Sequence, residues 1–235
     1  MDYAAAAASA PPGWRHFKRD DFDRLPAAIK LHELARVPPS ELRLLEAGDA
    51  AAEERFVRAE FWTLVYHLEP ERWDALSRVE PITPELIKLL PRVEHALDVG
   101  AGSGRLTMHL ALRSDVVAAI EPAHGLARML RDRMPGHVHA VEGWAESLPV
   151  HDGWSQLTTA CGAFGPDAAV LSELERVTCA GGTIALINPE DAEWFETHGW
   201  LRRDVRPAAV KAHDAWIDEF FGPPDPPHVL VTREV

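Results

Sequence analysis

After residue 90, the chain alternates short apolar segments with segments in which apolar residues recur with helical periodicity. The segment 116–120 is apolar throughout, as expected for a parallel strand that is buried on both faces. The expected strands cover 96–99, 116–120, 138–142, 157–160, 183–188, 201–205 and 228–234, and the expected helices cover 104–113, 123–133, 167–178, 190–199 and 210–221. This alternation predicts an α/β fold with a doubly wound, mostly parallel seven-stranded sheet and right-handed crossovers.

Residues 19–90 show helical patterns only, interrupted by prolines and a glycine. The pattern is strongest over 51–68, where aromatic and apolar side chains fall on one helical face. Helices before the first strand of such a fold commonly lie over the carboxyl ends of the strands, where ligands bind. We therefore predict a disordered tail (1–18), a helical cap or lid (19–90) and a core (91–235). A dimerisation arm is the alternative interpretation of the helical segment.

A glycine-rich loop lies between the first expected strand and helix, within the sequence V-E-H-A-L-D-V-G-A-G-S-G-R-L-T of residues 93–107. Glycines suit a backbone that turns sharply and approaches a ligand closely. The dinucleotide fingerprint G-x-G-x-x-G does not fit, because its third glycine, counted from Gly100, would fall on Arg105. A P-loop does not fit either, since no Gly-Lys-Ser/Thr follows. The structural alternative is a turn that only allows strand and helix to pack.

The charge and cysteine content narrow the classes of partner. A formal net charge of −13 weighs against a DNA or RNA substrate, because such a surface repels a phosphate backbone. The two cysteines, Cys161 and Cys179, do not indicate a disulfide framework, which fits a reducing cytoplasm. The alanine-rich N-terminus lacks the basic region of a signal peptide, and no apolar run approaches the length of a membrane span. We therefore expect a cytoplasmic protein without nucleic-acid or membrane partners.

The pattern Asp-x-Gly-x-Gly-x-Gly at 98–104 resembles motif I of the class I S-adenosylmethionine-dependent methyltransferases. Further segments follow in the family's order: Glu121 at the end of the second strand, Gly-Trp-Ala-Glu-Ser-Leu-Pro at 143–149, and Leu-Glu-Arg-Val with Gly-Gly at 174–182. The resemblance covers about residues 90–235. It implies a Rossmann-like methyltransferase fold, S-adenosyl-L-methionine as the methyl donor and S-adenosyl-L-homocysteine as the product.

The resemblance also implies roles for individual residues. Asp98 would support the loop and the methionine amino group, and Glu121 would accept hydrogen bonds from both ribose hydroxyls. Trp144 replaces an acidic residue that binds the adenine amino group in the family. Trp144 could stack on the adenine or pack in the core, and Glu146 could take over the polar contact. The expected cofactor-binding residues are Asp98, Gly100, Ala101, Gly102, Gly104, Arg105, Glu121, Pro122, Trp144, Ala145, Glu146, Cys161 and Gly162.

The acceptor is predicted to be a small molecule. Cys161-Gly-Ala-Phe follows the fourth strand, where the family's amino-methylating nucleic-acid enzymes have N/D-P-P-Y/F. We expect in-line methyl transfer to an O or N atom, with much of the rate supplied by proximity. The catalytic residue is unassigned, and His67 is the candidate base, although packed or solvated histidines are more common. The candidate acceptor-binding residues are Trp62, Tyr66, His67 and Phe164. No metal site is expected.

Two other function classes remain open. A cofactor-binding regulatory or partner subunit without transfer activity is favoured by Trp144 and by the lack of an assignable base. An NAD-dependent oxidoreductase is disfavoured by the glycine spacing. Besides the small-molecule acceptor, a second copy of the chain is a possible partner, in a homodimer.

Overall fold

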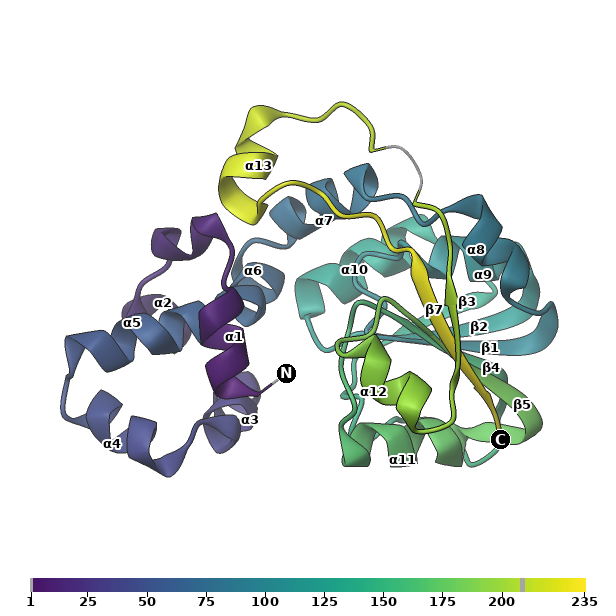
Figure 1. The fold of residues 1–235 in the computed structure, drawn as a ribbon, viewed down its shortest axis with the longest axis horizontal. Coiled ribbons are helices and arrows are strands. Elements are labelled where there is room, and N and C mark those ends of the chain that lie inside the picture. Colours follow the sequence, from purple (N-terminus) through teal and green to yellow (C-terminus); the bar gives the residue numbers. More distant parts are fainter. Residues whose placement is uncertain (1, 208–209) are drawn as a thin grey trace. The chain divides into compact units, whose positions relative to one another are not determined.

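The structure, a computed structural model, describes residues 2–207 and 210–235 and forms two compact units (Figure 1). The helical unit comprises Met1–Leu76 and Ala212–Pro224, and the sheet unit comprises Ser77–Lys211 and Asp225–Val235. The chain therefore passes three times between the units, after Leu76, after Lys211 and after Pro224. The predicted boundary at residue 90 differs from the observed one, which falls within a helix at Leu76.

The sheet unit is built on seven strands in the order β3-β2-β1-β4-β5-β7-β6. The strands are β1 (Val93–Val99), β2 (Ser114–Ile120), β3 (Val138–Val141), β4 (Ser155–Cys161), β5 (Thr178–Ile187), β6 (Leu201–Asp204) and β7 (Val229–Glu234). Neighbouring strands from β3 to β5 are parallel, and β7 is antiparallel to both β5 and β6. The predicted mostly parallel, seven-stranded fold is confirmed.

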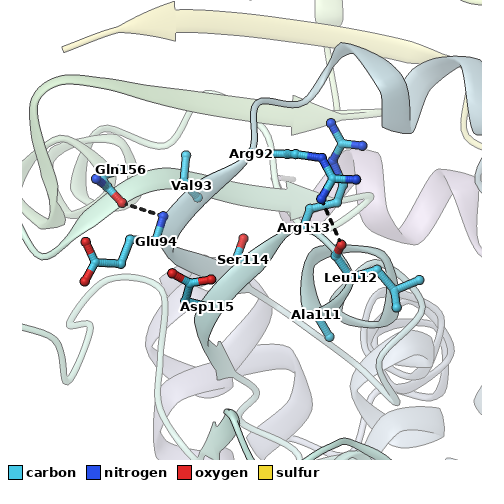
Figure 2. Close-up of a pocket in the computed structure, with 9 residues that line it drawn as sticks. All are labelled: Arg92, Val93, Glu94, Ala111, Leu112, Arg113, Ser114, Asp115 and Gln156. Carbon is cyan, nitrogen blue, oxygen red and sulfur yellow. Dashed lines mark hydrogen bonds between the residues drawn. The ribbon is translucent and has the colours of Figure 1, made fainter.

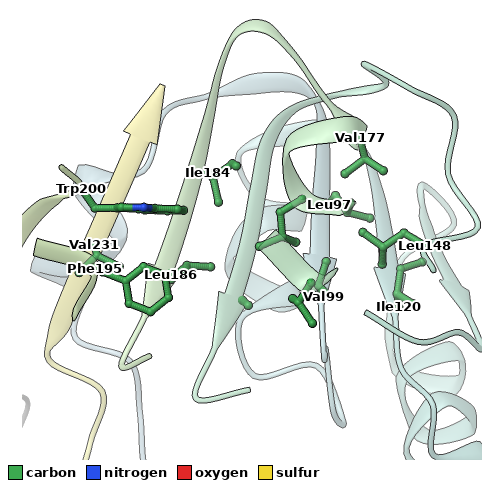
Figure 3. Close-up of a cluster of buried hydrophobic side chains, with 13 residues drawn as sticks. Leu97, Val99, Ile120, Leu148, Val177, Ile184, Leu186, Phe195, Trp200 and Val231 are labelled. Atoms are coloured by element: carbon green, nitrogen blue, oxygen red, sulfur yellow. The ribbon is translucent and has the colours of Figure 1, made fainter. Parts of the chain in front are cut away.

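Helices cover both faces of this sheet (Figure 1). They are α8 (Pro84–Leu89), α9 (Thr107–Ala111), α10 (His124–Arg133), α11 (Ala168–Val177) and α12 (Ala192–Thr197). Alternate residues of β1 face opposite ways, as the period of two in a strand requires. Leu97 and Val99 pack with buried residues of α11 and α12, whereas Ala96 packs with residues of α8 and α9. Figure 3 shows the first of these clusters, which extends to Trp200 and Val231.

Two element boundaries differ from those expected. The helix after the glycine loop begins at Thr107 instead of residue 104, because three glycines with positive φ prolong the turn before it. Strand β5 begins at Thr178 instead of residue 183, and its first residue pairs with Ser155 before a bulge in the register. Gly181 has a φ of +76° within this irregular start. The sequence predicts a helix up to Thr178 and a strand opened by Gly181 and Gly182, whereas α11 ends at Val177 and β5 follows it directly.

The helical unit contains nine described helical elements. They are α1 (Tyr3–Ser9), η1 (Pro12–His16), α2 (Arg19–Asp23), α3 (Ala27–Arg36), α4 (Pro39–Glu46), α5 (Ala50–Ala59), α6 (Phe61–Leu68), α7 (Pro70–Val79, which continues into the sheet unit) and α13 (Ala215–Phe221). The expectation of a disordered tail over 1–18 is wrong for the described residues 2–18. Asp2 caps α1 by accepting the backbone N–H of Ala5 at 2.7 Å, and alanine favours the helix. Phe17 is buried.

An aromatic cluster joins the N-terminal helices to α13. The predicted domain boundaries place this helix in the core domain, residues 91–235. Phe61 lies 6.0 Å from Phe17 and 5.5 Å from Phe220, measured between ring centroids. Trp62 stacks on Phe221 with centroids 5.7 Å apart. Aromatic contacts of this kind stabilise beyond the area they bury. The segment 212–224 therefore belongs to the helical unit because its aromatic residues complete that unit's core.

Glu60 is a buried carboxyl group between α5 and α6 of the helical unit. Its exposed fraction is only 5%, and one carboxyl oxygen has no hydrogen-bond partner. Burial raises the pKa of Glu60 to about 8, and the nearby Glu33 carboxylate adds to the shift. Glu60 therefore holds a proton in the folded protein at neutral pH.

The substitution Glu60→Gln tests this protonation. The pKa of Glu60 is higher in the folded protein than in the unfolded chain, so the wild type is fully stabilised by this group at pH values below the unfolded pKa. This contribution to stability is lost as the pH rises through the folded pKa of about 8. The free energy of unfolding of wild type should fall by on the order of 2 kcal/mol more than that of Glu60→Gln between slightly acidic and mildly alkaline pH. Urea unfolding followed by tryptophan fluorescence measures the difference. Equal pH dependence in wild type and Glu60→Gln would contradict it, and Glu54→Gln, at an exposed position, is the control.

Candidate cofactor site

The glycine loop follows β1 and has a backbone that side chains would disturb. Gly100, Gly102 and Gly104 have φ values of +68°, +57° and +104°, in the left-handed region that favours glycine. A Cβ on Gly100 would lie 2.8 Å from the Cβ of Ala163, and one on Gly104 would lie 2.4 Å from the Cε of Met134. The loop therefore requires glycine both for its conformation and for its close packing.

Glu121 connects this loop to the end of β2. Its Oε2 accepts the backbone N–H of Gly102, and its Oε1 accepts that of Ala123, each at 2.8 Å. The residue is 4% exposed, and burial raises its pKa to about 7, an effect that the two N–H donors oppose. Each carboxylate oxygen has two lone pairs, so each retains capacity to accept a further hydrogen bond. Glu121 can thus hold the loop and still receive ligand hydroxyls.

Asp98 lies beneath the loop and is 1% exposed. Its Oδ2 accepts the hydroxyl of Thr107 at 2.6 Å, and its Oδ1 accepts that of Thr159 at 3.3 Å. Burial raises the pKa of Asp98 to about 7, and the two hydroxyl donors oppose the shift. These contacts join β1, the start of α9 and β4, an arrangement that suits support of the loop. A contact of Asp98 with a cofactor amino group stays a prediction.

Arg105 and Cys161, both predicted at the cofactor, contact each other. The Nη2 of Arg105 lies 3.6 Å from the Sγ of Cys161 at the end of β4. The Nη1 of Arg105 donates to the carboxylate of Glu80 at 2.8 Å and to its backbone carbonyl at 3.2 Å. Burial raises the pKa of Cys161, so this thiol is not a nucleophile at neutral pH. Sequence reasoning missed Glu80, because it lies in a short linker that carries no periodic pattern or motif.

The segment after β3, predicted to contact adenine, is held by the chain's own side chains. The backbone N–H of Leu148 donates to Glu173 at 2.7 Å, and Arg176 donates to the carbonyls of Leu148 and Val150. Trp144 pairs with Ser147 in an isolated bridge. Trp144, Ala145 and Glu146 are all partly buried, and Ala145 packs against the core. The Glu-x-x-Arg segment of α11 therefore fixes this loop, a role that its spacing alone did not reveal.

The predicted acceptor residues fall in both units. Trp62, Tyr66 and His67 lie on α6 of the helical unit, whereas Phe164 follows β4 in the sheet unit. Trp62 and Tyr66 stack with centroids 5.8 Å apart. Burial lowers the pKa of His67 to about 4, so its imidazole is neutral at physiological pH but only weakly basic. Their role toward an acceptor stays a prediction.

The strand order gathers most of the predicted cofactor residues at one edge of the sheet. The carboxyl ends of β3, β2, β1 and β4 are successive neighbours, and they carry respectively the Trp144 segment, Glu121, the glycine loop, and Cys161 with Gly162. Pro122 follows Glu121, and Ala101 is buried within the loop. Along the chain, β2 and β3 follow β1 on one side of the sheet, whereas β5 follows β4 on the other side. Ligands of open α/β sheets bind at such a reversal of strand order.

A cavity of about 480 Å³ lies at the opposite edge, near the amino ends of β1 and β2 (Figure 2). Two arginines line it and donate to carbonyls that follow helix ends: Arg113 to Leu90 and Arg92 to Leu112. Such carbonyls lack partners within their own helices, so these arginines stabilise helix ends. Neither arginine is among the predicted cofactor residues.

Residues 96–182 match the family model described as a methyltransferase domain. Residues 96–182 thus belong to a class I S-adenosylmethionine-dependent methyltransferase domain. The chain is 35% identical over 124 residues to an uncharacterized methyltransferase of Mycobacterium tuberculosis, an alignment that covers 51% of this chain and 49% of the relative. It is 32% identical over 108 residues to malonyl-[acyl-carrier protein] O-methyltransferase of Geobacter sulfurreducens, covering 42% and 40%. The chain spans about half the length, or less, of these curated relatives.

A solved structure supports the fold independently. The SAM-dependent methyltransferase of Aquifex aeolicus superposes with a TM-score of 0.51 at 19% identity, covering 70% of this chain and 95% of that one. The residues of the methyltransferase domain fit the family's cofactor, S-adenosyl-L-methionine. The glycine loop turns through three residues with positive φ beside the end of β2, and Glu121 there retains lone pairs for ribose hydroxyls.

No helix in the part of the chain that the structure describes combines the length and apolar character needed to cross a membrane. Within 2–207 and 210–235, no three or more His, Cys, Asp or Glu side chains are grouped so that they could hold a metal ion.

Glu121 should make cofactor affinity depend on pH. Ribose hydroxyls donate more strongly to a carboxylate than to a protonated carboxyl group, and the pKa of Glu121 is raised to about 7. Affinity for S-adenosylhomocysteine should therefore rise by about tenfold as pH increases through neutrality. Glu121→Gln should bind more weakly and lose most of this dependence. Calorimetric titration across pH measures both effects, and an unchanged pH profile in the variant would assign the titration to another group.

Proposed function

We propose that this chain is an S-adenosylmethionine-dependent methyltransferase that acts on an O or N atom of a small molecule. The observation that carries the proposal is that the buried carboxylate of Glu121 fixes the glycine loop at the carboxyl ends of the strands. This arrangement suits a ligand with a ribose and an amino-acid chain. The family match supplies the identity of that ligand.

The chain's contribution to the reaction is positioning. A bound sulfonium cofactor supplies a methyl carbon that is already activated for in-line displacement. Glu121 and the glycine loop would hold and orient the cofactor, and a fixed geometry converts transfer into an effectively unimolecular step. Burial raises the pKa of the Cys161 thiol, which disfavours a covalent intermediate at this residue. An acceptor that requires deprotonation needs a base, and His67 is the proposed candidate.

The proposal of a small acceptor rests on charge and on the residues after β4. The net charge of −13 opposes a nucleic-acid substrate, and Cys161-Gly-Ala-Phe lacks the motif of amino-methylating nucleic-acid enzymes. One relative, from Geobacter sulfurreducens, is named as an O-methyltransferase, which is compatible with an oxygen acceptor here. We propose that Trp62, Tyr66 and Phe164 contact the acceptor. A role of the helical unit as a lid or in a homodimer is likewise proposed.

A cofactor-binding subunit without transfer activity is the second candidate. Trp144 stands at the position of the family's adenine-binding acid, and the low pKa of His67 makes it a weak base. Turnover distinguishes the candidates. Release of S-adenosylhomocysteine in the presence of a panel of hydroxyl and amine acceptors supports the enzyme. Tight cofactor binding with no turnover across the panel favours the regulatory subunit.

Substitution in the glycine loop tests cofactor binding directly. Gly102→Arg places a bulky side chain where φ is +57°, so affinity for S-adenosylmethionine should fall by at least about a hundredfold. Gly136→Arg is the matched control, because a Cβ at Gly136 meets no atom within 4 Å and its φ is not positive. Calorimetric titration should show wild-type affinity for the control. Comparable affinity in Gly102→Arg would contradict the assignment of the loop to the cofactor.

A further inference from the structure

Arg105 places a buried positive charge immediately after the glycine loop. Its side chain is 14% exposed, and its guanidinium reaches Cys161 at the end of β4. It therefore lies between the carboxyl ends of β1 and β4, where the strand order reverses and the ligand is expected. Such a buried charge is stable only when it is paired.

Glu80 supplies the pairing charge. Its side chain is 15% exposed and lies 2.8 Å from Arg105. The other groups facing Arg105 are weaker partners. Asp98 accepts two threonine hydroxyls and has a pKa raised to about 7, and burial raises the pKa of the Cys161 thiol. Burial also raises the pKa of Glu80, an effect that the guanidinium opposes, and the 2.8 Å contact sets the carboxyl group directly against the positive charge.

Glu80 lies outside the matched domain, which begins at residue 96. It lies in the linker between α7 and α8, close to the point where the chain enters the sheet unit at Ser77. The hydroxyl of Ser77 is 3.3 Å from that of Ser103 in the glycine loop. The backbone N–H of Asp225, where the chain enters the sheet unit again, donates to the Glu80 carboxylate. At one entry point Ser77 thus contacts the glycine loop, and at the other Asp225 contacts Glu80.

The charge of the ligand makes this pairing consequential. The sulfur of S-adenosylmethionine is positively charged, whereas that of S-adenosylhomocysteine is neutral, and the two ligands are otherwise alike except for the methyl group. An unpaired guanidinium near the loop would repel the first ligand more than the second. At a separation of about 10 Å and an effective dielectric constant of about 20, this repulsion corresponds to about a tenfold change in affinity.

We propose that Glu80 is a charge-balancing and positioning residue of the cofactor site, which neutralises Arg105 and thereby allows the glycine loop to accept a sulfonium ligand. The proposal rests on the proposed function, because it concerns the same site. It assigns a role in donor binding to a residue that the family's domain does not contain.

Glu80→Gln tests the proposal through ligand charge. Calorimetric titration should show affinity for S-adenosylmethionine falling by about tenfold, and affinity for S-adenosylhomocysteine falling by less than about threefold. Arg105→Gln should shift the ratio of the two affinities in the opposite direction. The double variant Glu80→Gln/Arg105→Gln should restore a ratio close to that of wild type. Glu85→Gln is the control, because Glu85 is exposed and contacts Thr83 and Lys88 instead.

The outcomes separate this inference from the proposed function. Equal losses for both ligands in Glu80→Gln would show a purely structural role and overturn the proposal, as would an unchanged affinity ratio. If Glu80→Gln does not fold, as judged by circular dichroism, the ratios of Arg105→Gln and the double variant decide. Absence of binding of either ligand to wild type would overturn the proposed function together with this inference.

Discussion

The cofactor site at the carboxyl ends of the strands depends on the hydrogen bonds that the Glu121 carboxylate accepts. By accepting the backbone N–H groups of Gly102 and Ala123, this carboxylate fixes the loop after β1 to the loop after β2. The parallel register of these strands, which pairs Val99 with Ile120, brings the two loops together. Removing the carboxylate would leave two N–H groups without this acceptor, and a buried donor without a partner costs about 1–3 kcal/mol. One side chain thereby combines loop support with capacity for a ligand.

Buried charge is concentrated at this edge. Glu80, Asp98, Arg105 and Glu121 are all largely buried there, and burial raises the pKa of each of the three acids. Such groups cost free energy to bury and cluster at functional sites. A cationic sulfonium ligand would bring a positive charge close to these three acids, whose pKa values burial raises. The buried charged groups and the glycine loop therefore lie together at the carboxyl ends of the strands, where the ligand is expected.

Local sequence signals predicted the sheet and the glycine loop because strand alternation and glycine spacing are themselves local. They also led to Glu121, since an acid that ends the second strand of such a sheet must lie beside the first loop. Glu80 was missed because its importance arises from a contact with Arg105 that is long-range in sequence. The α1 helix was missed although Asp2 before an alanine run is a helix-start signal. The placement of α13 was wrong because Phe220 and Phe221 could pack in either unit, and only tertiary contacts with Phe61 and Trp62 decide.

A crystal structure of the protein with bound S-adenosylhomocysteine would test the central claim most directly. We predict both ribose hydroxyls within hydrogen-bond distance of the Glu121 carboxylate, with its contacts to Gly102 and Ala123 retained. The amino-acid part of the ligand should lie against the glycine loop. Ligand density at another place on the chain, or a Glu121 side chain turned away from the ribose, would contradict the account.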